Sequence, residues 1–129
     1  LPVGELLPRV DVLTLHCPLT PATRGLLGAA QLALMKPDAL VINTARGALI
    51  DVPALADALR AGRLGGAAID VLPEEPPIAG SALFAPDLPN LIVTPHVAWA
   101  ARDARQRALD EMAANVADFL AGGRRGRVA

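Results

Sequence analysis

The chain has 129 residues, of which 53% are hydrophobic and 19% are charged, and its net charge is −1. This composition excludes a disordered chain and gives no general attraction to nucleic acid or to anionic lipid. No apolar run approaches the roughly 20 residues that a membrane span needs, and the amino end lacks the features of a secretion signal. The one cysteine, Cys17, excludes an internal disulfide and predicts a reducing, cytoplasmic location.

Four apolar runs predict four buried β-strands, and stretches of helical period lie between most of them. Strands that alternate with helices predict an α/β fold, a Rossmann-like parallel sheet with helices on both faces. Continuous apolar runs suit strands that are covered on both faces. The runs are Val10–Leu15, Ala39–Ile42, Ala67–Ile69 and Leu91–Val93, and the strands predicted around the last two are Gly65–Val71 and Leu91–Thr94.

A short apolar turn, Leu6–Arg9, leads into the first strand. The composition of Ala29–Lys36 predicts a helix that the following proline ends. Asp51 is the expected N-cap of the next helix, with Pro53 in the first turn. The long, proline-rich Leu72–Asn90 is expected to be a functional or mobile loop without structure of its own.

The last predicted helix is the longest, and one stripe of it is apolar. Gly122 and Gly123 are placed to end this helix, so the domain is predicted to span residues 1–122 and a solvated tail residues 123–129. The stripe consists of Leu109, Met112, Ala113, Val116, Phe119 and Leu120.

A glycine-rich phosphate-binding turn is absent from the sequence. No G-x-G-x-x-G occurs, and the glycines of Gly62–Gly66 precede a strand instead of following one. We therefore expect an incomplete sheet that lacks the first βαβ unit with its Gly-rich turn, in a chain that begins in the middle of a larger protein. An unpaired edge at the first or third strand is expected to promote association.

Each apolar run ends in a short polar cluster. In parallel sheets, ligands bind beyond the carboxyl ends of the strands, so these clusters are expected to form one reaction centre. The clusters are His16-Cys17-Pro18, Asn43-Thr44-Ala45-Arg46-Gly47, Asp70 with Glu74-Glu75-Pro76, and Thr94-Pro95-His96.

The residue types in these clusters suit acid–base chemistry on a carboxylate. Arg46 can bind a carboxylate through two parallel hydrogen bonds, and Gly47 lets the backbone turn sharply there. Glu75 beside His96 favours the charged imidazole, which suits a general acid near neutral pH. Each residue also has a structural alternative. Arg46 could pair with a nearby surface acid, Glu75 and His96 could be two unrelated loop residues, and Asp70 could be a structural cap of the following turn.

A metal site is not expected. His16 and Cys17 are adjacent, but no further cysteine or histidine has the spacing that would complete a zinc site of three or four ligands.

Taken together, these clusters resemble the carboxyl-terminal part of the D-isomer-specific 2-hydroxyacid dehydrogenases. The resemblance covers essentially the whole chain, in order and at family spacing. Each motif is weak alone, and the four together are specific. The matching stretches are His16–Thr20, Asn43–Gly47, Ala68–Val71 with Glu75-Pro76, and Thr94–Trp99.

The resemblance implies an oxidoreductase that moves a hydride between NAD or NADP and a small 2-keto or 2-hydroxy acid. Arg46 would hold the substrate's carboxylate and keto oxygen, His96 would be the acid and base, and Glu75 would orient the imidazole. Asp70 would bind the carboxamide of the nicotinamide. The implied cofactor-binding residues are His16, Cys17, Pro18, Thr23, Thr44, Ala45, Arg46, Asp70, His96 and Ala98.

Trp99 points within the family to glycerate dehydrogenase or hydroxypyruvate reductase-like members, and so to hydroxypyruvate or glyoxylate. Packing of Trp99 against the last helix is the alternative. A homodimer is also predicted, because an unpaired strand edge and the apolar stripe of the last helix favour association. A second function stays open, a non-catalytic nucleotide-binding or assembly module that is inactive as an isolated fragment. Intact Arg46, Glu75 and His96 favour the enzyme.

Overall fold

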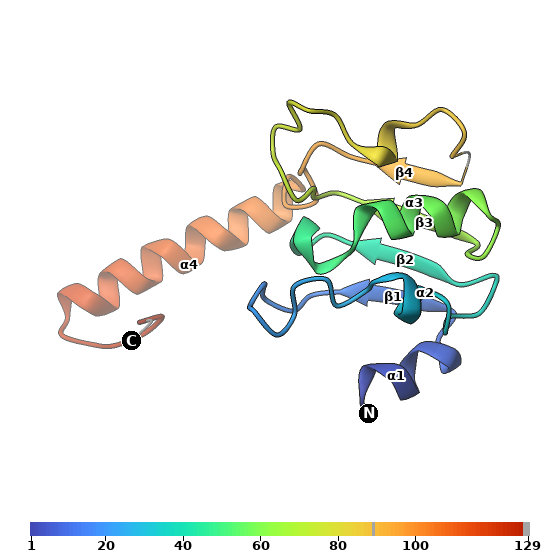
Figure 1. Cartoon of the computed structure of the whole chain (residues 1–129). Helices are drawn as coiled ribbons and strands as arrows, with labels where there is room; N and C mark the ends of the chain where they lie inside the picture. Colours follow the sequence, from blue (N-terminus) through green and yellow to red (C-terminus); the bar gives the residue numbers. More distant parts are fainter. Residues whose placement is uncertain (89, 128–129) are drawn as a thin grey trace. The chain divides into compact units, whose positions relative to one another are not determined.

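The computed structural model describes residues 1–88 and 90–127. The chain divides into two compact units, Leu1–His96 and Val97–Ala129. The first unit contains the β-sheet with its short helices, and the second contains one long helix (Figure 1).

The sheet has four parallel strands, whose order in space is the order in the chain. The predicted α/β, Rossmann-like parallel sheet is therefore confirmed. β1 is an open edge, as expected, but the expectation for the third strand is wrong, because β3 pairs with a neighbour on each side and β4 forms the other edge. The strands are β1 (Val12–Leu15), β2 (Leu40–Asn43), β3 (Gly66–Ile69) and β4 (Leu91–Val93).

The helices of the first unit are short. The α-helices are α1 (Val3–Leu6), α2 (Ala29–Leu32) and α3 (Val52–Arg60), and 3-10 turns cover Leu7–Arg9, Gly47–Leu49 and Ala82–Phe84.

Two of these elements differ from the prediction. The stretch Leu6–Arg9, expected to be a turn, is helical, because it holds the end of α1 and a 3-10 turn. α2 ends before Lys36, because beyond Leu32 the backbone bonds tighten to the 3-10 spacing, as from the N–H of Met35 to the carbonyl of Leu32 at 3.2 Å.

The predicted N-cap of α3 is confirmed. The Asp51 Oδ1 accepts a hydrogen bond from the N–H of Ala54 at 3.0 Å, and a proline stands in the first turn. The described part of the Leu72–Asn90 connection contains structure that was not expected, because Ser81 accepts a hydrogen bond from the N–H of Leu83 and caps a 3-10 turn. Asp51 therefore behaves as the sequence predicts, whereas the Ser81 cap was not anticipated.

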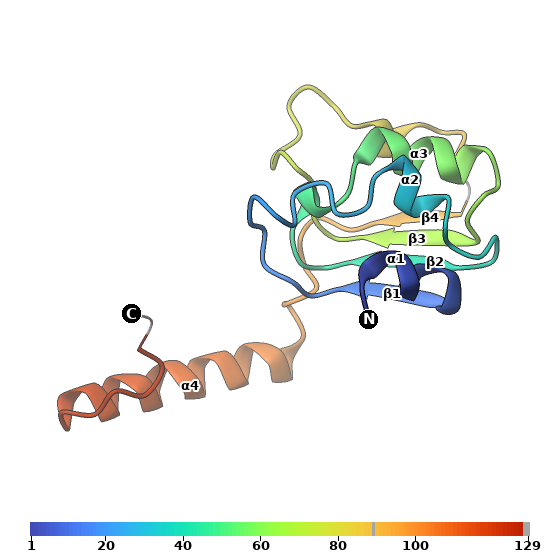
Figure 2. The same ribbon diagram turned by 60° about the horizontal axis from the view of Figure 1, so that its bottom comes forward.

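One face of the sheet forms the core. In Figure 2, α2 and α3 lie over this face. The side chains of alternate strand residues point into it and are buried with those of the two helices, as period-two burial requires. The buried cluster includes Leu15, Val41, Ala67, Ile69, Leu27, Leu32, Leu49, Leu55, Leu59 and Leu64.

The other face of the sheet is largely exposed, although it is also apolar. Val12, Leu40 and Ile92 are 51%, 41% and 65% exposed, and the paired register puts Val12 beside Leu40 on this face. The expectation of helices on both faces is therefore not met within the Leu1–His96 unit. The apolar runs correctly indicated strands with two apolar faces, but the helices of this unit cover only one of them.

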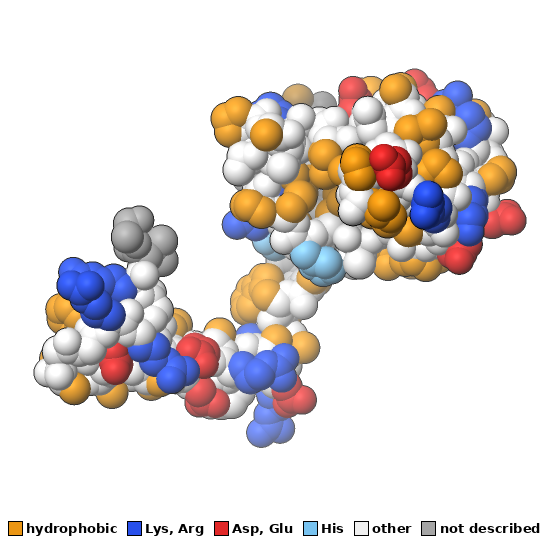
Figure 3. All heavy atoms as spheres, turned by 90° about the horizontal axis from the view of Figure 1, so that it is seen from below, with side chains coloured by type: hydrophobic (Ala, Val, Ile, Leu, Met, Phe, Trp, Pro, Cys, Tyr) orange, Lys and Arg blue, Asp and Glu red, His pale blue; other side chains and the backbone are white. Residues whose placement is uncertain are grey.

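The second unit is dominated by α4 (Arg102–Leu120), which contains no buried residue. The predicted apolar stripe is present, but its large side chains, among them Met112 and Phe119, are all more than half exposed. Figure 3 shows acidic, basic and apolar side chains mixed along this helix. Within the described residues no helix has the length and apolarity that crossing a bilayer requires.

The tail after α4 folds back onto its own helix. The guanidinium of Arg125 donates to the Glu111 carboxylate at 2.9 and 3.0 Å, and the Arg125 N–H donates to the Asp118 carboxylate at 2.8 Å. The part of the tail that the structure describes is therefore anchored, although the Arg125 side chain is still half exposed.

We expect the purified chain to self-associate at micromolar concentration, because the open sheet face and the α4 stripe both present apolar side chains to water. Light scattering measures this directly. Ile92→Lys on the sheet face should lower the average mass, whereas Ile78→Lys, which changes an isoleucine that is 86% exposed in a loop, should not. A stable monomer of the unmodified chain would contradict the expectation.

Candidate active site

Polar side chains follow all four strands at one edge of the sheet. His16 comes directly after β1, Asp70 directly after β3, and Arg46 and His96 within three residues of the ends of β2 and β4. Because the strands are parallel and in register, their carboxyl ends lie together. The predicted gathering of these residues at one edge is confirmed.

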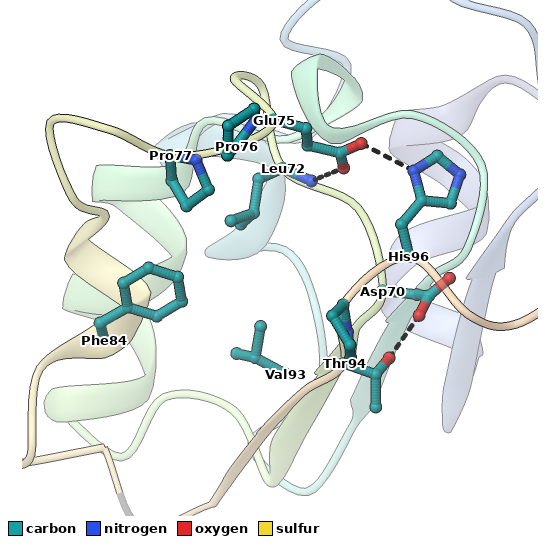
Figure 4. A pocket seen from close by; sticks show the side chains of 10 residues that line it. Asp70, Leu72, Glu75, Pro76, Pro77, Phe84, Val93, Thr94 and His96 are labelled. Carbon is teal, nitrogen blue, oxygen red and sulfur yellow. Dashed lines mark hydrogen bonds and ion pairs between the residues drawn. The ribbon is translucent and has the colours of Figure 1, made fainter.

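Glu75 and His96 form a hydrogen-bonded pair. The Glu75 Oε2 lies 2.7 Å from the His96 Nδ1, and the Glu75 Oε1 accepts a hydrogen bond from the N–H of Leu72 at 2.6 Å (Figure 4). Both oxygens of the carboxylate are therefore hydrogen-bonded. The bond from Leu72 fixes the carboxylate, and the carboxylate in turn orients the imidazole. Glu75, and not the exposed Glu74, is the partner of the histidine, as the Glu-Pro motif predicted.

These contacts lower the pKa of Glu75 below its ordinary value of 4.5. The largest cause is the hydrogen bond from the Leu72 N–H, followed by the hydrogen bond with His96, while partial burial and the charge of Asp70 oppose the shift. The Glu75 carboxylate therefore stays ionised, and accepts hydrogen bonds, to a lower pH than an ordinary glutamate.

The sign of this shift predicts how stability depends on pH. A carboxyl group whose pKa is lower in the folded state stabilises the fold fully above pH 4.5, and the contribution is lost as the pH falls through the folded-state pKa. We expect Glu75→Gln to unfold at lower urea concentration than the parent at about pH 7, and the difference to vanish once the pH has fallen below the folded-state pKa of Glu75. Glu74→Gln should match the parent at every pH, and a pH-independent difference for Glu75→Gln would refute this linkage.

The backbone at His96 is held in an uncommon conformation. Its φ of 55° lies in the left-handed region, and its N–H donates to the carbonyl of Asp70 at 2.9 Å. A non-glycine residue in this region requires support from its surroundings and is often found at functional sites. Here the bond to Asp70 ties the end of β4 to the end of β3.

A second tie between these strands involves side chains. The Asp70 carboxyl group is almost fully buried, and its Oδ1 accepts a hydrogen bond from the Thr94 hydroxyl at 2.5 Å. Burying a carboxylate is costly unless hydrogen bonds compensate, so Thr94 stabilises the position of Asp70 at the strand end.

A hollow of about 550 Å³ lies beside the Glu75–His96 pair. Its walls are mostly apolar and include Leu72, Phe84 and Val93 (Figure 4). The second ring nitrogen of His96, Nε2, points away from these residues in Figure 4.

A second hollow of about 550 Å³ opens between the ends of β1 and β2, lined by residues 16–19 and 44–46. The Arg46 guanidinium folds over its own loop, where Nη1 donates to the carbonyl of Ala45 at 2.6 Å. Thr23 does not line this hollow. Its hydroxyl donates to the Pro18 carbonyl at 2.7 Å and so closes the loop that does.

Asn43 shapes the loop that carries Arg46. This buried side chain accepts a hydrogen bond from the N–H of Ala45 at 3.0 Å and donates one to the carbonyl of Arg46 at 2.9 Å. Both hydrogen bonds go to the loop that follows Asn43, and together they fix the path of the backbone from β2 to Arg46.

A backbone clasp joins the segments on the two sides of this hollow. Leu27 and Ile50 form a parallel bridge, which extends into bonds from the Gly25 N–H to the Ala48 carbonyl at 2.9 Å and from the Asp51 N–H to the Leu27 carbonyl at 3.0 Å. The chain that leaves β1 is therefore fastened to the chain that leaves β2 just beyond Arg46.

A family profile described as "D-isomer specific 2-hydroxyacid dehydrogenase, NAD binding domain" matches residues 1–98. The chain belongs to this family. The resemblance seen in the four motifs is confirmed. A glycerate dehydrogenase from Methylorubrum extorquens is 54% identical over 117 residues, which cover 91% of this chain and 37% of the relative.

Two solved structures share the fold of the chain. A D-lactate dehydrogenase with NAD⁺ from Lactobacillus jensenii has a TM-score of 0.80 at 31% identity, over 98% of this chain and 41% of that one. An acyclic imino acid reductase (Bsp5) in complex with NADPH and D-Arg has a TM-score of 0.78 at 36% identity, over 95% and 38%. This chain thus spans about two fifths of the length of these relatives.

Some features of the candidate site have no role assigned from the sequence. Asn43 and Thr94 stood inside recognised motifs, and only Asn43, a polar residue directly after a buried strand and before a turn, carried a local signal. Ala98 belongs to the second unit, so its cofactor role rests on the resemblance alone. Among the described residues, no three His, Cys, Asp or Glu side chains are grouped to hold a metal ion.

Proposed function

We propose that this chain is the catalytic and cofactor-binding part of a D-2-hydroxyacid dehydrogenase acting on a small 2-keto or 2-hydroxy acid. The observation that carries the proposal is the Glu75–His96 pair, held at 2.7 Å at the sheet edge where the Arg46 loop also ends. A carboxylate-binding cation and an oriented imidazole are the two groups that this chemistry needs from the protein.

Each of the three residues has a distinct role. Arg46 binds the substrate carboxylate through two parallel hydrogen bonds and polarises the keto oxygen. Glu75 accepts a hydrogen bond from the Nδ1–H of His96 and so orients the ring, and Nε2 gives a proton to the carbonyl oxygen during reduction and takes one from the hydroxyl during oxidation.

The residues present fit a nicotinamide cofactor, NAD or NADP. The hollow along residues 16–19 and 44–46 has the size of a small-molecule site, and the buried Asp70 carboxylate can accept hydrogen bonds from a carboxamide. The cofactor supplies the hydride, and the protein supplies position and electrostatics. The residues proposed to contact it are His16, Cys17, Pro18, Thr44, Ala45, Arg46, Asp70, His96 and Ala98, with Thr23 supporting the loop.

Hydroxypyruvate and glyoxylate are the substrates that we favour, because the 54% identical relative is a glycerate dehydrogenase and because of Trp99. A homodimer and a cytoplasmic location remain predictions. The alternative function is a non-catalytic nucleotide-binding or assembly module. The joint presence of Arg46, Glu75 and His96 favours the enzyme, since binding a nucleotide requires no acid–base pair.

The test is a chimaera in which this chain replaces the matched segment of the Methylorubrum enzyme. We expect it to oxidise NADH or NADPH, followed by absorbance, with hydroxypyruvate or glyoxylate. A folded chimaera that binds the reduced cofactor but turns over neither keto acid would favour the non-catalytic alternative.

The isolated 129-residue chain is expected to show little or no turnover in the same assay. It contains no Gly-rich pyrophosphate turn, and loss of those contacts costs several kcal/mol of cofactor binding, enough to abolish turnover at ordinary concentrations. Turnover by the isolated chain comparable to that of the unmodified Methylorubrum glycerate dehydrogenase would contradict this expectation.

A further inference from the structure

Gly47, next to Arg46, touches the backbone of another loop. A Cβ atom at this position would lie closer than 3.0 Å to backbone atoms of Leu72 and Pro73, a distance that real Cβ atoms essentially never show. The φ of Gly47 is not positive, so space and not backbone conformation requires glycine. The sharp turn expected from the sequence is therefore not the reason for this glycine.

The loop that Gly47 touches holds the acid–base pair. The N–H of Leu72 donates to the Glu75 Oε1 at 2.6 Å, and the Glu75 Oε2 lies 2.7 Å from His96. Leu72 is thus both the residue on which Gly47 rests and the donor that holds Glu75. On the other side, Asn43 fixes the loop from β2 to Arg46 through two hydrogen bonds.

We propose that Gly47 is a positioning residue, whose direct backbone contact with Leu72 sets the spacing between the Arg46 loop and the Glu75–His96 pair. Any side chain at position 47 would push Leu72 away and disturb the N–H that holds Glu75. That this spacing serves catalysis rests on the proposed dehydrogenase function, whereas the contact and its effect on Glu75 do not.

The experiment is a titration of the Glu75 carboxyl group by ¹³C NMR in the whole chain and in Gly47→Ala. The pKa of Glu75 is lowered chiefly by the Leu72 N–H, and the titratable groups that act on it are His96 and Asp70. We expect the pKa to rise toward 4.5 in Gly47→Ala. An unchanged pKa in a folded Gly47→Ala would overturn the proposal.

Gly65→Ala is the matched control. A Cβ at Gly65 would also come closer than 3.0 Å to backbone, that of Asp38, but Gly65 precedes β3 and lies at the opposite end of the strand from Glu75. It should leave the Glu75 pKa at the parent value. An equal rise in both variants would mean a general loss of packing and would also overturn the proposal.

A second measurement decides the matter if Gly47→Ala does not fold. Glu75→Gln changes an exposed loop residue, and we expect it to shift the amide resonance of Gly47, whereas Glu74→Gln should not. No shift in Glu75→Gln would refute the coupling. Neither measurement uses cofactor, substrate or turnover, so its outcome is separate from that of the dehydrogenase assay.

Discussion

Replacing His96 with asparagine in the chimaeric dehydrogenase is expected to lower kcat by about 10²- to 10⁴-fold, the usual contribution of a positioned acid–base group. Asparagine is the informative substitution, because it accepts the left-handed backbone that His96 adopts at φ 55°. The variant therefore removes the proton donor while it leaves the backbone of the loop in place. Steady-state rates of NADH oxidation with hydroxypyruvate measure the effect.

The chain offers a matched control in its only other histidine, His16. It follows β1, at the opposite edge of the sheet from β4, and its Nε2 lies 2.8 Å from the Thr14 hydroxyl. His16→Asn should act mainly on the KM for the cofactor and much less on kcat. A His96→Asn enzyme that kept more than about a tenth of the parent kcat would rule out His96 as the acid.

Arg46→Lys is expected to lower kcat/KM for the keto acid by about 10- to 100-fold, because hydrogen bonds to charged groups contribute about 1.5–3 kcal/mol each and lysine cannot form the parallel pair. Because lysine keeps the positive charge, the fall in kcat/KM measures the loss of the bidentate hydrogen bonds to the carboxylate. Arg60→Lys is the control, since Arg60 pairs with Asp57 and Asp87 on the surface at the end of α3. Equal kcat/KM for Arg46→Lys and the parent would remove Arg46 from the substrate site.

The sheet could be predicted because its signals are local. Each apolar run forms one strand. Because the strands are parallel, the polar residues that follow them lie together at the carboxyl-end edge of the sheet. The edge strands could be predicted only in part, because an edge depends on which strands neighbour one another. β1 is an edge as expected, whereas the run that became β3 has a neighbour on each side. The prediction that helices cover the second face of the sheet was not met within this unit. Val12 and Ile92 show that this face is apolar, but a strand's sequence does not say which element covers it.

The site was predictable where chemistry is carried by reactive side chains and less so where it depends on support. Glu75 and His96 follow neighbouring strands, and a carboxylate and an imidazole at the same sheet edge suit acid–base chemistry, so the sequence motifs that contain them indicated a site. Thr94 and Gly47 act through one hydrogen bond and one backbone contact to residues more than 20 positions away, at Asp70 and Leu72. Such long-range contacts leave no spacing pattern in the sequence.

The clasp between Leu27 and Ile50 has a thermodynamic consequence for any ligand of the neighbouring hollow. Because backbone hydrogen bonds fasten the two loops to each other, their conformational entropy is lost when the chain folds and not when a ligand arrives. The two loops are therefore preorganised, and a nucleotide should bind in the hollow with little change in their backbone conformation. Affinity at this hollow would then follow the quality of the contacts themselves, free of the penalty that a disordered loop imposes.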